Sequence, residues 1–166
     1  MMLRCLFVAL LALALAACAS TPPLETESVD TTLTPQRAAQ NIDAAEGKRA
    51  LWGGVILSGK NYSDYTELEL LSYPVADDHR PELNGTPGGR FIARVDGYLE
   101  LAEYDQGSAL TVVGPITGTR EGTVGETAYT YPIVTAEQRH LWPDPQPQTR
   151  QDSNVRFHFG LGVIFR

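Results

Sequence analysis

The feature that most constrains the fold is a two-residue alternation of apolar and polar residues in several short segments after residue 50. In residues 65–73, YTELELLSY, Leu68 and Leu70 alternate with Glu67 and Glu69. Successive side chains of a strand point to opposite faces of its sheet, so this spacing predicts strands with one face toward a core. We therefore expect a mostly β chain with only short helices.

Five strands are predicted, in the segments 51–57, 65–73, 90–95, 109–118 and 128–134. In the fourth, Val112 is expected to point inward and Thr111 outward. The pair Gly53 and Gly54 in the first strand predicts a bulge or a close approach of two backbones. In the fifth, the alternate residues Tyr129, Tyr131 and Ile133 share a face.

Connections between the strands are marked by Gly, Pro and Asp. Residues 74–89 contain three prolines, an Asn-Gly and a Gly-Gly, which predict a long loop, and TREGTVGE at 119–126 predicts a Gly-rich turn. A helix should begin at Pro35, with Thr34 as its N-cap, and end at Gly47. After a tight turn at Asp96-Gly97, residues 98–107 predict two helical turns ending at Gly107.

The order of these elements is three strands, a short helix and two strands. That is the arrangement of the OB-fold, a partly open five-stranded Greek-key barrel. A two-sheet sandwich usually needs about seven strands. We therefore expect an OB-like barrel over residues 34–142.

The N-terminal residues 1–17 predict a signal peptide, because Arg4 is their only charge and an apolar core follows. That core is shorter than the roughly 20 residues of a membrane-spanning helix. The segment Leu15-Ala16-Ala17-Cys18 matches a bacterial lipobox, which predicts cleavage between Ala17 and Cys18. Cys18 would then carry a diacylglyceryl group and an N-acyl chain, a permanent anchor. The alternative is an ordinary signal peptide cleaved near Ala17, Ala19 or Ser20.

Composition limits the partners that we expect. With Cys5 removed and Cys18 lipidated, no thiol remains for a disulfide. The processed chain has 12 basic and 20 acidic residues, a net charge of −8, without a basic stripe for nucleic acid. We expect no cofactor or metal beyond the covalent lipid.

The segments that flank the barrel have their own patterns. Residues 18–33 are polar and Thr-rich and predict a lipidated tether, and residues 143–154 predict a linker of Pro, Gln and Asp. Residues 155–166 predict an additional C-terminal strand. It pairs either with an edge of its own sheet or with another chain, a second copy or a different envelope protein. Its apolar face comprises Phe157, Phe159, Leu161, Val163 and Phe165.

Several short motifs occur together in a characteristic order and spacing. After the lipobox they are Trp52-Gly53-Gly54, Gly89-Arg90-Phe91, Asp96-Gly97-Tyr98-Leu99, Leu110-Thr111-Val112-Val113-Gly114, Val124-Gly125-Glu126, Tyr129-Thr130-Tyr131-Pro132 and Leu141-Trp142. In these motifs the chain resembles the Slp family, the starvation-inducible outer-membrane lipoproteins of Gram-negative bacteria. The resemblance implies an outer-membrane lipoprotein of starvation or stationary-phase physiology, and supplies no catalytic residues. Ala19, in place of the Asp that commonly retains lipoproteins in the inner membrane, agrees with this localisation.

Candidate chemical groups are few. Asp77-Asp78-His79 is the nearest approach to a metal cluster, but it lies in the Pro-rich loop and has no spaced second ligand pair. His140 and His158 have no acid or nucleophile near them in sequence. Asp96 fits a tight turn. Glu126 is either a binding carboxylate at the barrel rim or a solvated charge.

Aromatic residues at strand spacing suggest a second possibility. Aromatic faces of OB barrels often bind ligands, although such residues also fill cores. A ligand face here would favour sugar or peptide over nucleic acid, and it comprises Trp52, Tyr129, Tyr131 and Trp142. We therefore expect a non-enzymatic, periplasm-facing lipoprotein that binds a partner or supports the outer membrane. The alternative is a periplasmic hydrolase or a small-ligand-binding domain.

Overall fold

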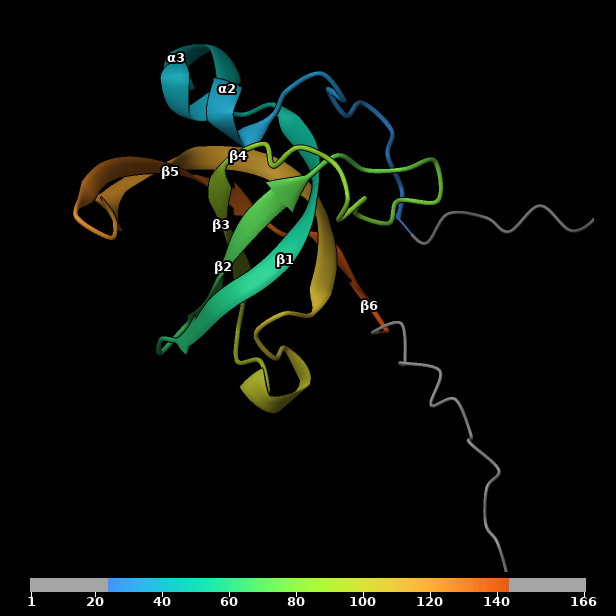
Figure 1. Ribbon diagram of the computed structural model, residues 1–166, viewed down its shortest axis with the longest axis vertical. Coiled ribbons are helices and arrows are strands. Elements are labelled where there is room, and N and C mark those ends of the chain that lie inside the picture. The colour runs from blue at the N-terminus through green and yellow to red at the C-terminus, as the bar shows by residue number, and fades with distance from the viewer. Residues whose placement is uncertain (1–23, 144–166) are drawn as a thin grey trace, which may run out of the picture.

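Six strands form one continuous sheet in the computed structural model, which describes residues 24–143 (Figure 1). The predictions for the signal peptide, Cys18, His158 and the strand 155–166 lie outside the described residues. The strands are β1 (Arg49–Asn61), β2 (Tyr65–Tyr73), β3 (Arg90–Asp96), β4 (Ala109–Val124), β5 (Thr127–Thr135) and β6 (Gln138–Trp142).

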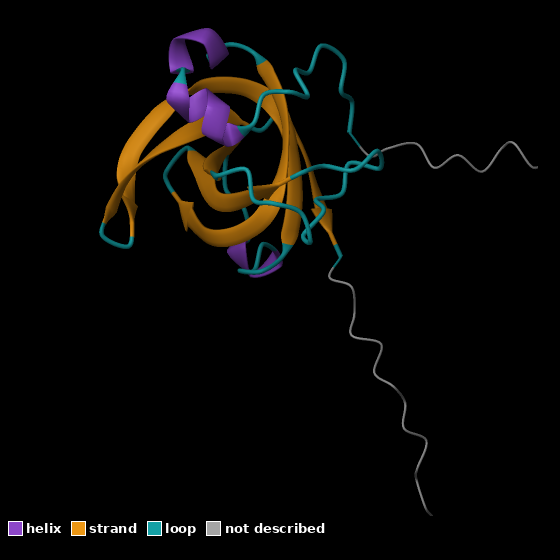
Figure 2. Ribbon diagram, turned by 45° about the horizontal axis from the view of Figure 1, so that its top comes forward, coloured by secondary structure: helices purple, strands orange, loops and turns teal. Residues whose placement is uncertain are grey.

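The first five strands close into a ring. Their order is β1-β2-β3-β5-β4, and β4 pairs back with β1, while β3 and β5 form the parallel pair. Figure 2 shows the curved strands enclosing the interior. This strand order confirms the predicted OB-like five-stranded barrel. Within the described residues, β6 is the one strand that the sequence prediction missed.

Strand β6 continues along β4 from the place where β5 leaves it. β5 pairs with β4 from Val124 back to Ile116, and β6 pairs with it from Val113 to Ala109. The short segment QRHLW has no clear alternation, so its pairing follows from the neighbouring strand rather than from its own pattern.

The hairpin of β4 and β5 is longer than predicted. The prediction of a Gly-rich turn over residues 119–126 was wrong, because β4 runs to Val124 and only Gly125 and Glu126 form the turn. Gly125 has a φ of +60°, which glycine adopts readily. The hairpin extends away from the body of the barrel (Figure 1).

The helices are shorter than predicted. α2 spans Pro35–Gln40 and begins as expected, since the Thr34 Oγ1 accepts a hydrogen bond from the N–H of Arg37. Asn41 then interrupts the helix and caps α3, Ile42–Ala45. The two helical turns predicted in residues 98–107 are reduced to the 3₁₀-helix η1, Leu101–Glu103, because Glu100 caps a single turn. No helix among residues 24–143 is long and apolar enough to cross a membrane.

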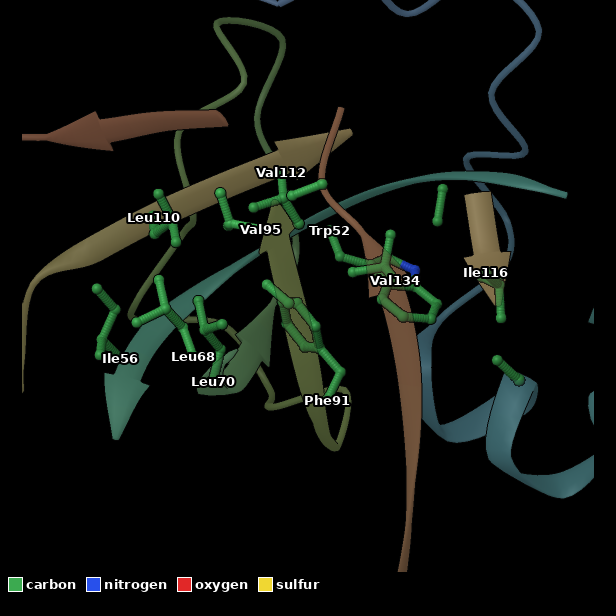
Figure 3. Packing of buried hydrophobic residues seen from close by; sticks show 14 of the residues in the cluster. Trp52, Ile56, Leu68, Leu70, Phe91, Val95, Leu110, Val112, Ile116 and Val134 are labelled. Atoms are coloured by element: carbon green, nitrogen blue, oxygen red, sulfur yellow. The ribbon is translucent and has the colours of Figure 1, made fainter. Parts of the chain in front are cut away.

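The barrel interior forms the main core (Figure 3). Trp52 and Phe91 meet edge to face, with ring centroids 5.2 Å apart. Val112 points inward as predicted, but the expectation that Thr111 faces outward into water was wrong, since both residues are fully buried. Thr111 donates a hydrogen bond to the backbone oxygen of His79, so loop 74–89 covers the outer face of β4 there.

Close backbone approaches explain two glycines. A Cβ on Gly54 would lie 2.3 Å from the Leu71 carbonyl oxygen, and one on Gly114 would lie 1.8 Å from that of Thr135. The predicted close approach at Gly54 is thus confirmed. The bulge of β1 lies further along the strand, between Ile56 and Ser58.

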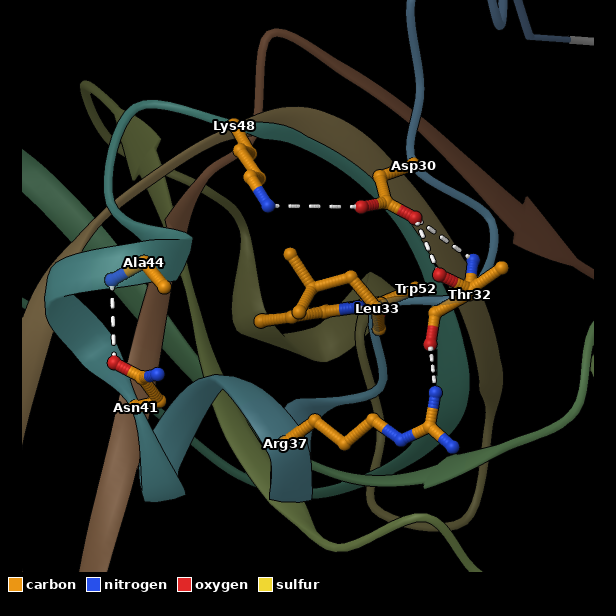
Figure 4. Close-up of polar contacts among 8 residues, drawn as sticks. All are labelled: Asp30, Thr32, Leu33, Arg37, Asn41, Ala44, Lys48 and Trp52. Atoms are coloured by element: carbon orange, nitrogen blue, oxygen red, sulfur yellow. Dashed lines mark hydrogen bonds and ion pairs between the residues drawn. The ribbon is translucent and has the colours of Figure 1, made fainter.

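Residues 24–33 lie along the barrel, although the sequence assigned them to the tether. Asp30 donates its N–H to the Arg49 carbonyl and forms an ion pair with Lys48. The indole of Trp52 donates to the Leu33 carbonyl at 2.6 Å. Figure 4 shows the ion pair of Lys48 and Asp30, with Leu33 next to Trp52. We call residues 24–33 the N-terminal strap.

Candidate functional site

A bulge in β4 turns part of the β4–β5 hairpin toward the outer face of the barrel. Ile116 pairs with Val134 and Gly118 with Ile133, so Thr117 is an extra residue on β4. An extra residue inverts the faces of the residues that follow it. Arg120 and Val124 consequently share a face with Tyr131 and Tyr129 of β5.

The outer face of β2 carries glutamates, and that of the neighbouring β3 carries arginines. Glu67 lies opposite Arg94 on the neighbouring strand, and Leu71 lies opposite Arg90. From the β4–β5 hairpin, Arg120 reaches Glu67 as well. Three arginines and two glutamates therefore meet on one surface. We call Arg90, Arg94, Arg120, Glu67 and Glu69 the arginine cluster.

Glu67 is the centre of the arginine cluster. Its side chain is only 6% exposed, and its two carboxylate oxygens accept hydrogen bonds from Arg94, at 3.0 Å, and from Arg120. Burial alone would raise the pKa of Glu67, but hydrogen bonds and charges from Arg94 and Arg120 outweigh burial and lower it. Glu67 is thus held ionised.

A third ion pair joins Arg90 to Glu69 at 2.8 Å. The hydrogen bond to Glu69 raises the pKa of Arg90 above its ordinary value. Burial, followed by the nearby charge of Glu69, raises the pKa of the Tyr131 hydroxyl. Tyr131 donates that hydroxyl to the Thr123 carbonyl at 3.0 Å, so its ring crosses the hairpin.

Aromatic stacking holds one of the arginines in place. The guanidinium of Arg94 lies 4.6 Å from the ring centroid of Tyr65, which stacks on Tyr62 at 4.7 Å. Lys60 lies over the ring of Tyr62 at 4.8 Å. The Nε of Arg94 is buried and has no hydrogen-bond partner among the described residues.

A groove lies beside the arginine cluster, between the hairpin and the start of β3. Its volume is about 540 Å³. The Tyr129 hydroxyl accepts a hydrogen bond from the N–H of Arg90 at 2.7 Å and so joins the hairpin to β3. We call this the hairpin groove, and it is lined by Gln36, Leu71, Pro87, Gly89, Arg90, Val124, Thr127 and Tyr129. Arg90 belongs to both features.

The four aromatic residues of the predicted ligand face do not share one surface. Trp52 lies in the main core and also lines a separate groove of about 330 Å³ beside the strap. Tyr129 and Tyr131 pack in a second, smaller cluster with Ile92 and Ile133. Trp142 lies on β6, where its indole donates to Thr111. Of the four, the structure brings together Tyr129 and Tyr131, beside the arginine cluster.

The other candidate residues lie apart. Residues 24–143 contain no group of three His, Cys, Asp or Glu side chains that could hold a metal ion. His79 is buried, with a φ of +70°, in loop 74–89. His140 contacts Trp142 edge to face. Asp96 is exposed at the end of β3, and Glu126 is exposed in the hairpin turn.

The sequence analysis missed the arginine cluster. One signal was available, because Glu67 and Glu69 share one face of a predicted strand, and Arg90 and Arg94 share one face of the next predicted strand. Antiparallel pairing places such residues opposite one another. Arg120 gave no such signal, because it lies in residues 119–126, which the sequence analysis assigned to a turn.

Comparison with known families identifies the chain. The family model described as "Outer membrane lipoprotein Slp family" matches residues 15–162. The chain belongs to this family. The resemblance seen in the sequence motifs is therefore confirmed, as is the outer-membrane lipoprotein class that it implied.

Relatives of this Slp-family chain include an uncharacterized lipoprotein, YeaY, of Escherichia coli K12. The two are 32% identical over 113 residues, which cover 66% of this chain and 58% of that protein. "Outer membrane protein Slp" of the same organism is 26% identical over 96 residues, which are 58% of this chain and 50% of that protein. The chain thus spans between half and three-fifths of the length of these relatives.

A solved structure, the small single-stranded DNA-binding protein of Streptomyces coelicolor, is also similar to the Slp-family chain. Its sequence identity is 14% and the TM-score is 0.37, with 57% of this chain and 94% of that chain covered. The barrel assignment rests on the strand order described above.

Proposed function

We propose that this Slp-family protein is a non-enzymatic binding module of the outer membrane. Lipid on Cys18 anchors it, and the hairpin groove with the adjoining arginine cluster binds its partner or ligand. We place the barrel on the periplasmic side. We also place its activity in starvation or stationary phase, the physiology that the family resemblance implies.

One observation carries the proposal, namely that the Thr117 bulge directs the hairpin residues toward the charged face of β2 and β3. Bulges frequently occur next to functional sites, where they redirect side chains. Stability alone does not require Glu67 at this position, since a buried ion pair can often be replaced by apolar residues without loss of stability. A surface that retains ionic groups and also borders a groove fits a binding site.

Photo-crosslinking in intact stationary-phase cells tests the binding surface. A photoreactive amino acid replaces Thr127, which lines the hairpin groove. The matched control replaces Ala128, which is exposed and pairs with Thr123 on the opposite face of the hairpin. Mass spectrometry should identify a specific adduct at position 127 and none at 128. Equal capture at both positions, or none at either, contradicts the proposal.

The anchor has a separate test. Mass spectrometry of the processed N-terminal peptide should show a diacylglyceryl cysteine at Cys18, and Cys18→Ser should release the protein from the membrane fraction or leave it uncleaved. An unmodified N-terminus at Ala19 or Ser20 would favour the ordinary signal peptide.

A further inference from the structure

We propose that the ligand of the hairpin groove is an anionic amphiphile, an inference that rests on the proposed binding function. Its acidic head group binds the arginine cluster, and its apolar part lies in the hairpin groove. Such a ligand carries one compact negative charge next to an aliphatic chain.

The head group is assigned from the unused donors of the arginines. A guanidinium has five N–H donors in a planar fork, and Glu67 accepts one hydrogen bond each from Arg94 and Arg120. The Arg120 side chain is 46% exposed, so its remaining donors can reach a ligand. Planar forks of this kind match the oxygens of phosphate and carboxylate groups.

Local charge favours an acidic group at this place. The cluster contains three arginines against two glutamates, whereas the whole chain has a net charge of −7. A long polyanion such as nucleic acid would meet the acidic remainder of the surface. A single head group requires only the local positive charge.

The apolar part is assigned from the lining of the hairpin groove. Leu71, Pro87, Val124 and Tyr129 present apolar surface, and the volume of about 540 Å³ lies within the usual range for ligand pockets. Arg90 lines this groove and pairs with Glu69 of the cluster, so the charged and apolar parts adjoin. A molecule with both parts would use both surfaces at once.

A binding experiment with soluble short-chain probes tests the ligand class. The full-length lipoprotein, held in phosphatidylcholine nanodiscs, is titrated with dihexanoylphosphatidylglycerol and, separately, with decanoate. We expect at least one anionic amphiphile to bind at least tenfold more tightly than dihexanoylphosphatidylcholine or inorganic phosphate. The preferred probe distinguishes a phosphate head group from a carboxylate. Equal affinity for the zwitterionic probe, or no binding of either anionic probe, would overturn the inference.

Variants assign the binding to this site. Arg120→Gln combined with Glu67→Gln removes one charge of each sign, so no buried carboxylate loses its partner. It should weaken binding about tenfold, the effect of losing one charge-assisted hydrogen bond. The control is Arg139→Gln, which removes an arginine outside the cluster that donates to the Tyr104 hydroxyl, and it should leave the affinity unchanged. Unchanged affinity in the double variant rejects the assignment of the head group.

A matched pair of substitutions tests the hairpin groove. Val124→Asp places a negative charge in the hairpin groove, whereas Thr123→Asp places it on the opposite face of the same hairpin. Only the first should abolish binding, and equal effects reject the groove. If position 127 instead captures a protein or glycan and neither amphiphile binds, the proposed function stands and this inference fails. If position 127 captures nothing, the proposed function itself fails.

Discussion

The two halves of β4 differ in nearly every physical respect, although they form one strand. Residues 109–115 pair with β1 on one side, and residues 109–113 also pair with β6 on the other. Ile116 completes this first half, and residues 118–124, the second half, pair with β5 alone among the described strands. The first half is buried on both faces, while most of the second half is exposed. Between them lies the extra residue Thr117.

This difference shows how one strand serves both the barrel and the candidate site. The first half holds the ring closed and contributes Val112 and Ile116 to the core. The second half contributes Arg120 and Val124 to the outer surface. Substitutions should therefore affect stability in the first half and binding in the second.

The largest effect is expected from a charge in the first half. Val112→Asp buries a carboxylate among apolar side chains, and Thr111→Asp buries one that loses the hydrogen bond to the His79 carbonyl and keeps only the Trp142 indole as a donor. Each should cost several kcal/mol, a large part of a typical total of about 5–15 kcal/mol. Thr123→Asp, on the exposed half, should change stability by less than about 0.5 kcal/mol. Thermal unfolding followed by circular dichroism measures all three. A mild effect of Thr111→Asp would mean that loop 74–89 does not cover that face in solution.

A smaller contrast is expected between two glycines. The Cβ of Gly114→Ala would lie 1.8 Å from the backbone oxygen of Thr135, which the closed ring holds in place, and should cost about 3 kcal/mol. In Gly122→Ala the nearest atom belongs to the Tyr131 side chain, not to backbone, and lies 3.1 Å away, so a shift of a few tenths of an ångström relieves the contact and the cost should be below about 1 kcal/mol. Urea unfolding compares the two variants. Similar costs would show that β4 is equally constrained along its length.

The third prediction concerns pH and the arginine cluster. Glu67→Gln should destabilise the protein by about 1–3 kcal/mol at pH 7, because two charge-assisted hydrogen bonds weaken. The folded state lowers the pKa of Glu67, so the stabilisation is complete above the ordinary value of 4.5. It is lost as pH falls through the lower pKa of the folded state.

The difference between wild type and Glu67→Gln should therefore shrink below about pH 4.5. Urea unfolding at pH 7 and at a series of lower values measures it. Glu121→Gln is the control, since Glu121 lies on the exposed face of the hairpin and accepts a hydrogen bond only from Thr130 among the described residues. A difference that grows on acidification would contradict the lowered pKa.

The barrel was predictable because its determinants are local. Alternation at Leu68 and Leu70, and the order of strands and turns, were enough to indicate a five-stranded ring. The long hairpin could not be predicted in this way. A glycine in the sequence suggests a turn whether it bends the chain, as Gly125 does, or lies within a strand, as Gly118 and Gly122 do. The arginine cluster was harder still, because its residues come from three strands and meet only through the register and the Thr117 bulge.

The N-terminal strap has a mechanical consequence. If Cys18 carries the lipid that we propose, a pull between barrel and membrane reaches the fold through a few contacts, including the hydrogen bond from Asp30 to Arg49 and that from Trp52 to Leu33. Strand β1 behind them is bonded to both β2 and β4, so the strap should peel away before the ring opens. Ten released residues at about 3.3–3.6 Å each can span at most about 35 Å, and the reach grows by the part of that span that the docked strap does not already cover. Under load, the strap would detach and extend first, and the barrel would stay folded.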